Sequence, residues 1–360
     1  MLDNIQNIQN FKREKSVYNL NQQTFYDFSA FDLIKDKKSL LVCDNAFDCF
    51  GIEIPCKTVK FNSFTPNPKY EDILTGVKLL NETNCDCIVA VGGGSSIDTA
   101  KAIKYFSGID NADNDSNSSI DNVNDDLPIM AIPTTSGTGS EATHFAAIYK
   151  NGEKYSLADE RLLPEYVVLQ ADMLKTLPLY QKKCTMLDAL CQAIESWWSR
   201  GATKESIQYS REAVKLILNN MEGYLNNEEF GNKKMLLASN LAGKAINITT
   251  TTAPHAMSYK LTTLYGLSHG HAVALCLPKV WKKMKNFSDI ASTLGYQNYK
   301  EAVAFLEELL QKLEIFPPEN VTEEELEILT NSVNAERLSN NPVLFDKETI
   351  KNLYKEILEV

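Results

Sequence analysis

Residues 89–101, VAVGGGSSIDTAK, have the pattern of a buried strand, a turn of three glycines and the start of a helix. Glycine lets backbone N–H groups come close to a phosphate, and a helix N-terminus offers partial positive charge and unsatisfied donors. The stretch is neither the G-x-G-x-x-G fingerprint nor a P-loop, because Ile97 takes the place of the last glycine and no Gly-Lys-Ser/Thr follows. Taken alone, it is equally typical of a tight strand–helix turn that binds nothing.

A second segment of the same kind favours nucleotide binding. Residues 132–143, IPTTSGTGSEAT, follow the next strong strand and are dense in hydroxyls and glycines. Such groups can donate to phosphates and to ribose, and ligands of open α/β sheets bind at the carboxyl ends of the strands. Two such segments in succession make ordinary turns the weaker interpretation.

Short apolar runs around these segments predict a parallel sheet in the first half of the chain. They cover residues 39–43, 58–61, 87–91, 127–132 and 166–169. Each run is continuously apolar and is separated from the next by a helical stretch, which is typical of strands covered by helices on both faces.

The second half of the chain has helical periodicity instead. Apolar residues recur at three- and four-residue steps over 207–225 and 303–313, and Pro317-Pro318 ends the latter pattern. The sequence therefore predicts an α/β, Rossmann-like dinucleotide-binding domain over residues 1–177 and an all-α domain over residues 178–360.

Charge and composition exclude some classes of partner. The 360 residues carry a formal net charge of −11, so a general nucleic-acid binder or an anionic-membrane binder is not expected. More than half of this excess comes from six aspartates between residues 109 and 126, a segment without Lys or Arg that we expect to be a solvated, mobile loop. These aspartates are Asp110, Asp113, Asp115, Asp121, Asp125 and Asp126.

The compartment signals favour the cytoplasm. The eight cysteines are scattered and form no C-x-x-C pair, as expected of reduced thiols. Residues 1–15 are polar and rich in Asn and Gln, without the apolar core of a signal peptide. No window approaches the roughly 18 consecutive apolar residues of a membrane span, so no membrane partner is expected.

The histidines are few and concentrated, which indicates a metal or acid–base site. Asp188 and Gln192 lie four residues apart in a helical stretch, so their side chains share one face. Imidazole suits transition metals and proton transfer. Three of the four histidines fall within seventeen residues: the four are His144, His255, His269 and His271. The alternative is a set of unrelated core or surface histidines.

Taken in order, these motifs resemble the iron-containing (group III) alcohol dehydrogenases, which share their fold with glycerol dehydrogenases and dehydroquinate synthases. The matching residues are 92–101, 133–141, 188–195 and 255–270, with PNP at 66–68 and NP at 341–342 in addition. The resemblance implies a dinucleotide-binding domain, a helical domain, and a metal in the cleft between them. It also implies interconversion of an alcohol and an aldehyde with NAD or NADP, and a homo-oligomer.

The resemblance implies a set of residues for the cofactor. They belong to the pyrophosphate turn, to the second nucleotide loop and to the lining of the cofactor cleft. These residues are Asn67, Gly93, Gly94, Ser95, Asp98, Thr134, Thr135, Thr138 and Lys154. Asp44 matches the position that selects between NAD and NADP. A carboxylate there can bond ribose hydroxyls and would repel a 2′-phosphate, so NAD is expected.

The resemblance also implies a metal site. Asp188, His255 and His269 match metal ligands of the family, whereas Gln192 stands where the family has a further histidine. An amide oxygen is a neutral and weaker ligand, so the metal is open: Fe²⁺ is expected, with Zn²⁺ as the alternative. Tyr259 stands where the family has a histidine credited with proton transfer. Either Tyr259 or the additional His271 could take that role.

Around these departures the chain resembles the phosphonoacetaldehyde reductase branch, which reduces phosphonoacetaldehyde to 2-hydroxyethylphosphonate. A phosphonate calls for cations or hydroxyls near the metal, and Lys244, Thr251 and His144 are the residues expected to supply them. Lys244 is the preferred one, because a charge within an apolar helix needs a reason.

Three alternatives remain open from the sequence. One is a generic alcohol or aldehyde dehydrogenase of the same family. Another is a lyase or cyclase resembling dehydroquinate synthase, but residues 142–147, ATHFAA, replace its lysine- and glycine-rich stretch. The third is a non-catalytic nucleotide-binding protein with a decayed metal site. The replacement of two family histidines by Gln192 and Tyr259 is consistent with it.

Overall fold

The computed structural model describes residues 22–108, 123–333 and 335–359, which form two compact units. The first unit ends at Met173 but excludes residues 135–139, which group with residues from Leu174 onward in the second unit. The expected boundary lay after residue 177 and assigned the loop 135–139 to the first domain. Residues 1–15 and most of the expected loop at 109–126 lie outside the described residues.

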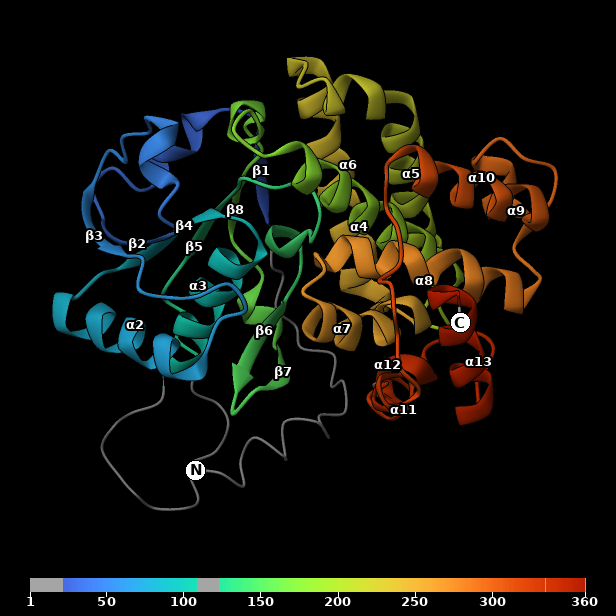
Figure 1. Ribbon diagram of the computed structural model, residues 1–360. Coiled ribbons are helices and arrows are strands. Elements are labelled where there is room, and N and C mark those ends of the chain that lie inside the picture. Colours follow the sequence, from blue (N-terminus) through green and yellow to red (C-terminus); the bar gives the residue numbers. More distant parts are fainter. Residues whose placement is uncertain (1–21, 109–122, 334, 360) are drawn as a thin grey trace. The chain divides into compact units, whose positions relative to one another are not determined.

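The first unit is built on a six-stranded sheet in which all pairs are parallel, as predicted (Figure 1). The strand order is β1 (Gln23–Phe25), β8 (Tyr166–Val168), β5 (Ile129–Pro133), β4 (Cys87–Gly92), β2 (Lys38–Cys43) and β3 (Lys57–Phe61). The five apolar runs correspond to β2, β3, β4, β5 and β8. Strand β1 has three residues, only partly buried, and carries no comparable apolar signal.

Both faces of this sheet are covered, and successive residues of β2 show how. Leu40 and Val42 pack in one apolar cluster with residues of α2 (Tyr70–Thr83) and α3 (Gly94–Ser107). Leu41 and Cys43 pack in a separate cluster with residues of the short helix Phe28–Leu33. Since alternate side chains of a strand point to opposite faces, a buried central strand must be apolar throughout.

An antiparallel hairpin in the first unit was not predicted. It consists of β6 (Phe145–Lys150) and β7 (Glu153–Ala158), joined by Asn151 and Gly152, which both have positive φ (53° and 80°). An Asn-Gly pair between two short runs is the usual signal for such a two-residue turn. The runs themselves are only half buried, so they lack the continuous apolar pattern of the main sheet.

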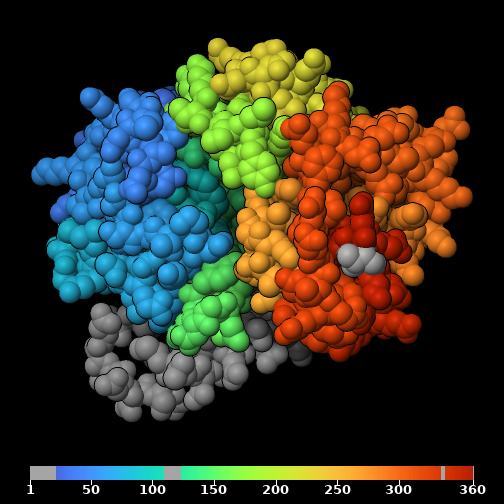
Figure 2. Space-filling model, in the orientation of Figure 1, coloured from blue at the N-terminus to red at the C-terminus, as the bar shows by residue number. Residues whose placement is uncertain are grey.

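The second unit is helical, as predicted, and no strand occurs among its described residues. Its helices are α4 (Leu179–Trp198), α5 (Lys204–Leu225), α6 (Glu229–Thr249), α7 (Ala253–Tyr265), α8 (His269–Met284), α9 (Ser288–Thr293), α10 (Tyr299–Lys312), α11 (Glu323–Asn331), α12 (Ala335–Ser339) and α13 (Lys347–Leu358). They share one apolar core, and in Figure 2 the orange-to-red helices α10 to α13 form a continuous surface. None of the described helices has the length and apolar character needed to cross a bilayer.

The loop 135–139 groups with the helices because it is packed among them. A Cβ on Gly139 would lie 2.6 Å from the Cα of Gly243 on α6. Ser136 donates from its hydroxyl to that of Tyr224 on α5, at 2.7 Å. The loop therefore continues a strand of the first unit but contributes its side chains to the second.

Candidate metal centre and nucleotide turn

Three residues expected to bind a metal come together in the helical unit. Asp188 lies on α4, His255 on α7 and His269 on α8, and one donor atom from each lies within 4.8 Å of the others. Oδ1 of Asp188 is 3.4 Å from Nε2 of His255 and 3.8 Å from Nε2 of His269. Metal bonds of about 2.0–2.2 Å to nitrogen and oxygen place neighbouring ligands roughly 3–4 Å apart, so this spacing fits a single ion.

The burial of the three predicted ligands differs. The side chains of Asp188 and His255 are each 4% exposed, whereas that of His269 is 34% exposed. A structural metal is enclosed by protein ligands, whereas a catalytic one keeps a position that a small molecule can reach. The exposed edge of this cluster is therefore the side of His269.

Glycine at position 270 explains how α8 comes so close to α4. A Cβ on Gly270 would lie 1.9 Å from the carbonyl oxygen of Cys184 and 3.0 Å from Cβ of Asp188. Any larger residue would push the first turn of α8 away from α4. Because His269 is the first residue of α8, the His-Gly pair places this imidazole against Asp188.

Gln192 lies one helical turn after Asp188 on α4 and is 4% exposed. Its amide nitrogen donates to the carbonyl oxygen of Thr138 at 3.3 Å. Its amide oxygen is buried and has no hydrogen-bond partner among the described residues. Buried acceptors are rarely left unsatisfied in folded proteins, and a bound cation beside Asp188 would satisfy this one. The donor set thus fits a divalent metal.

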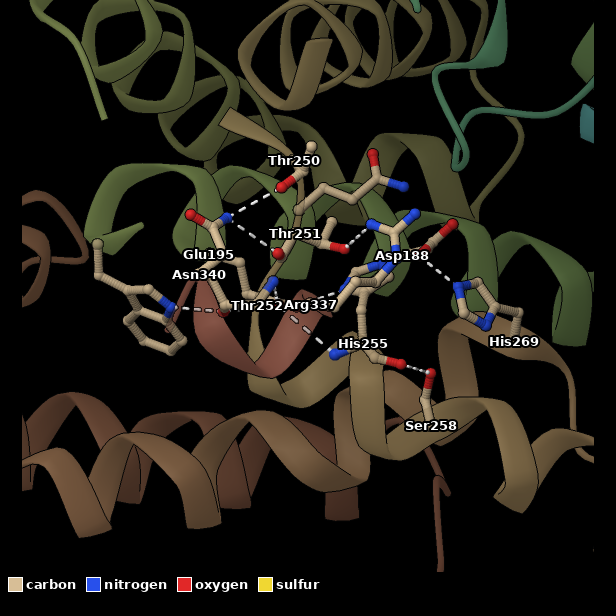
Figure 3. A network of polar contacts seen from close by, with 12 residues as sticks. Asp188, Glu195, Thr250, Thr251, Thr252, His255, Ser258, His269, Arg337 and Asn340 are labelled. Carbon is tan, nitrogen blue, oxygen red and sulfur yellow. Dashed lines mark hydrogen bonds and ion pairs between the residues drawn. The ribbon is translucent and has the colours of Figure 1, made fainter. Parts of the chain in front are cut away.

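Glu195, which was not predicted from the sequence, completes the group. One carboxylate oxygen contacts Nδ1 of His255, and the other accepts from the backbone N–H and the hydroxyl of Thr252, at 2.8 and 2.9 Å (Figure 3). Metal-binding histidines commonly give their second nitrogen to a carboxylate that fixes the ring. Position 195 lies two turns after Asp188 on the same face of α4. This spacing is the feature of the sequence from which Glu195 could have been predicted.

The electrostatics of the cluster favour a cation. Burial disfavours the charged form of His255, but the carboxylates of Glu195 and Asp188 outweigh this and raise its pKa to about 10. Two buried carboxylates therefore hold a proton on the imidazole between them. A divalent cation would take the place of that proton, since histidine binds metals in its neutral form.

The two candidates for proton transfer lie in different surroundings. Tyr259, one turn after His255 on α7, stacks its ring on that of His269 with centroids 5.8 Å apart and planes 9° apart. His271 has Nδ1 at 3.0 Å from the hydroxyl of Tyr180 and Nε2 at 2.8 Å from the carbonyl oxygen of Phe316. Burial lowers the pKa of His271, although the Phe316 carbonyl opposes the shift. Tyr259 thus lies against a predicted metal ligand, whereas both ring nitrogens of His271 have partners within the protein.

The glycine turn in the first unit leads into the uncapped N-terminus of a helix. Gly92 has φ of 152°, and a Cβ there would lie 2.1 Å from Oγ of Ser96. Helix α3 then begins at Gly94, and its N-cap Gly93 has no side chain to cap the first turn. A helix N-terminus of this kind, directly after a central strand, suits a pyrophosphate.

Three further predicted cofactor residues lie beside this turn. The backbone N–H of Asn67 donates to Oγ of Ser95 at 3.2 Å, and Asn67 has a left-handed conformation with φ of 62°. Asp44 directly follows β2, and its Oδ2 lies 3.7 Å from the Cβ position of Gly92. The N–H of Thr134 donates to the Gly92 carbonyl at 3.0 Å. All lie at the carboxyl edge of the sheet.

Asp98, another residue expected at the pyrophosphate turn, contacts residues of the loop and hairpin that follow β5. Its buried carboxylate accepts from the hydroxyl of Ser140 at 2.5 Å and from the N–H of Ala147 at 2.9 Å. It therefore joins α3 to the loop and hairpin, and Lys154 on β7 acts on it electrostatically. Lys101, which was not predicted, is fully buried and donates to the carbonyls of Ser140 and Thr143 in the loop and of Phe145 at the start of β6.

The remaining predicted residues are divided between the units. Thr135 and Thr138 lie in the loop that packs with the helices, and His144 lies in the first unit with its ring 4.0 Å from that of Phe145. Lys244 is half-buried on α6. Buried Thr251 accepts a hydrogen bond on its hydroxyl from Arg337 at 2.7 Å. Arg337 was not predicted, since no local pattern marks it.

Comparison with known proteins shows to which family the chain belongs. A family model described as iron-containing alcohol dehydrogenase matches residues 33–171, and its C-terminal counterpart matches residues 183–358. NAD-dependent methanol dehydrogenase of Bacillus methanolicus is 30% identical, over 72% of this chain and 73% of that protein. Alcohol dehydrogenase 4 of Saccharomyces cerevisiae is 28% identical over 91% and 94%. Phosphonoacetaldehyde reductase of Streptomyces viridochromogenes is 33% identical over 56% and 54%.

Solved structures are similar over almost the whole chain. Iron-containing alcohol dehydrogenase from Thermotoga maritima has a TM-score of 0.82 at 27% identity, covering 95% of this chain and 99% of that one. Sulfoacetaldehyde reductase from Bifidobacterium kashiwanohense, solved with NAD⁺, has a TM-score of 0.86 at 23% identity, covering 97% and 100%, which is a likeness of fold. The chain belongs to the iron-containing alcohol dehydrogenase family.

Proposed function

We propose that this chain reduces phosphonoacetaldehyde to 2-hydroxyethylphosphonate with NADH. As a family member it is an alcohol dehydrogenase or aldehyde reductase, and the observation that carries this reaction type is the buried cluster of Asp188, His255 and His269. The phosphonate is inferred from the resemblance of residues 141–145, 188–196, 252–256 and 269–275 to one branch and from the relative that is 33% identical.

The chain's own residues would hold a divalent cation through Asp188, His255, His269 and the amide oxygen of Gln192. We propose Fe²⁺, with Zn²⁺ as the alternative. When bound, the cation supplies Lewis acidity toward the aldehyde oxygen, and the nicotinamide supplies the hydride. Glu195 fixes the ring of His255 through Nδ1, so that Nε2 faces Asp188.

Tyr259 is proposed to deliver the proton that completes the reduction. Its ring lies parallel to that of His269, which is the most exposed of the three predicted ligands. The phenol O–H would donate to the oxygen that becomes the alcohol. A positioned acid of this kind contributes roughly 10²- to 10⁴-fold to the rate.

The preference for NAD over NADP is proposed from Asp44. It follows β2 beside the glycine turn, where a carboxylate accepts from ribose hydroxyls and repels a 2′-phosphate. A cytoplasmic location and a homo-oligomeric state are further parts of the proposal. All eight cysteines are free, which suits a reducing compartment.

The test is NADH oxidation by purified protein that has been stripped of metal and reloaded with Fe²⁺, Zn²⁺ or Mn²⁺. Phosphonoacetaldehyde should be reduced with a kcat/KM well above that of acetaldehyde or propanal. Equal values would overturn the phosphonate assignment in favour of a generic aldehyde reductase, the candidate that the methanol dehydrogenase relative favours. Absence of metal binding and of NADH oxidation with every aldehyde would instead indicate a non-catalytic nucleotide-binding protein.

A further inference from the structure

Arg337, on the short helix α12, contacts Thr251 and Tyr259 near the predicted metal site. Its Nη1 donates to the hydroxyl of Thr251 at 2.7 Å, and its guanidinium lies 5.9 Å from the ring centroid of Tyr259. Tyr259 in turn stacks on His269, the exposed member of the cluster. The guanidinium and a predicted metal ligand thus both lie close to the ring of Tyr259.

The turn that receives Arg337 is strained and firmly held. Thr250, between α6 and α7, has φ of 58° and ψ of −179°, a conformation that a β-branched residue rarely adopts. Asn340 holds the turn, since its side-chain N–H group donates to the carbonyl of Thr249, the hydroxyl of Thr250 and the carbonyl of Thr251, at 2.7, 3.0 and 3.1 Å (Figure 3).

Strain of this kind indicates a functional position. It is unfavourable and persists only where the surroundings enforce it, which is common at ligand sites. Here Asn340, which holds the strained turn, and Arg337 belong to the same short segment of the chain. Thr251 is 2% exposed, so its hydroxyl is a fixed point that orients the guanidinium plane.

A guanidinium held near a metal site suits small molecules that carry an anionic group. Its planar fork of five N–H donors matches the paired oxygens of phosphonate, sulfonate or carboxylate. A small aldehyde whose carbonyl faces the cluster at His269 would carry its second functional group toward Tyr259 and Arg337. Lysine would offer only a point charge there.

We propose that Arg337, oriented by Thr251 and Tyr259, is the residue that binds the anionic group of the substrate and selects acid-bearing aldehydes over neutral ones. The inference rests on the proposed function, because it assumes an anionic aldehyde. It differs from the expectation that Lys244 or His144 supplies the binding charge. Lys244 lies within α6, and His144 belongs to the first unit.

The first test compares kcat/KM for phosphonoacetaldehyde and propanal in the wild type, Arg337→Ala and Arg337→Lys. Loss of a hydrogen-bonded charge should lower kcat/KM for phosphonoacetaldehyde by roughly 10- to 100-fold, mainly through KM, and leave propanal little changed. Arg337→Lys should recover part of the loss. Thr251→Val should give a smaller loss in the same direction.

A matched control and a binding readout separate this site from general effects. Arg200 is exposed, and its backbone N–H donates to the Asn340 carbonyl at 3.0 Å, so Arg200→Ala removes a nearby arginine without touching Thr251. Thermal stability is measured with ethylphosphonate, ethanesulfonate or propionate, none of which can react. The wild type and Arg200→Ala should be stabilised by at least one of these anions, and Arg337→Ala by none.

The outcomes distinguish the two proposals. The wild type could prefer phosphonoacetaldehyde while Arg337→Ala keeps both that preference and the stabilisation by anions. This outcome overturns the role of Arg337 but not the proposed function. A wild type that prefers propanal and is stabilised by no anion overturns both proposals. Stabilisation by ethanesulfonate or propionate but not by ethylphosphonate, lost in Arg337→Ala, supports the anion site while changing the substrate.

Discussion

Glu195 contacts Nδ1 of His255 from the same face of α4 that carries Asp188, so one helix supplies both a predicted metal ligand and the group that orients another. Glu195 is fully buried, and its second oxygen accepts two hydrogen bonds from Thr252 at the start of α7. The carboxylate therefore fixes both the ring of His255 and the helix that carries it.

Glu195→Gln should weaken metal binding while leaving the fold intact. The amide keeps the size of the carboxylate but loses its charge, and loss of such an outer partner typically lowers metal affinity by roughly 10- to 100-fold. Fe²⁺ and Zn²⁺ affinities are measured by competition with a chelator, and folding by circular dichroism. Glu205→Gln, on the exposed surface of α5, is the control. Unchanged affinity in Glu195→Gln would show that His255 needs no orienting partner.

Proton transfer is tested by comparing Tyr259→Phe with His271→Ala. Tyr259→Phe keeps the stacking on His269 but removes the hydroxyl, so kcat should fall by roughly 10²-fold or more with metal content unchanged. His271→Ala removes hydrogen bonds to Tyr180 and Phe316 and should lower the melting temperature instead. A large loss of kcat in a stably folded His271→Ala variant, with Tyr259→Phe fully active, would reverse the assignment.

The sheet could be predicted from the sequence because its central strands are buried on both faces. Strand β4, for example, is apolar from Cys87 to Val91 and buried throughout. The hairpin of β6 and β7 could not be predicted in this way, because its residues are only partly buried and their pairing depends on the turn at Asn151 and Gly152.

The candidate site could be predicted only in part for a related reason. Asp188, His255 and His269 are marked by residue type and by family resemblance, and the structure brings them together. Arg337 carries no such mark, since its place beside Thr251 depends on how α12 packs against α7. The loop 135–139 was assigned to the wrong unit because the contact between Gly139 and Gly243 is a tertiary one.

Cofactor choice is tested at Asp44. Asp44→Ala removes the carboxylate beside Gly92, and a hydrogen bond to a charged group contributes about 1.5–3 kcal/mol, so the ratio of kcat/KM for NADH over NADPH should fall roughly tenfold or more. Asp48→Ala is the matched control, because Asp48 is exposed nearby and pairs with Lys60 at 2.9 Å. An unaltered ratio in Asp44→Ala would place cofactor selection elsewhere.

Lys182 provides a test of how burial controls stability. Its ammonium group is buried on α4, where it donates to the carbonyl of Tyr224 and to the side chains of Asn227 and Asn232, without a carboxylate among these partners. Burial lowers its pKa from 10.5 to about 8. In the unfolded chain the group keeps its ordinary pKa, so between pH 8 and 10.5 the unfolded state binds more protons than the folded state.

The direction in which the free energy of unfolding changes with pH follows from this difference in proton binding. The cost of burying the charge is fully present below pH 8 and is relieved as the pH rises toward 10.5, by about 3 kcal/mol at most. The free energy of unfolding of the wild type, measured relative to Lys182→Met, should therefore increase across this window. Lys215→Met, an exposed position on α5, should give no such trend. A difference between wild type and Lys182→Met that stays constant with pH would mean that Lys182 remains protonated in the folded state throughout the window.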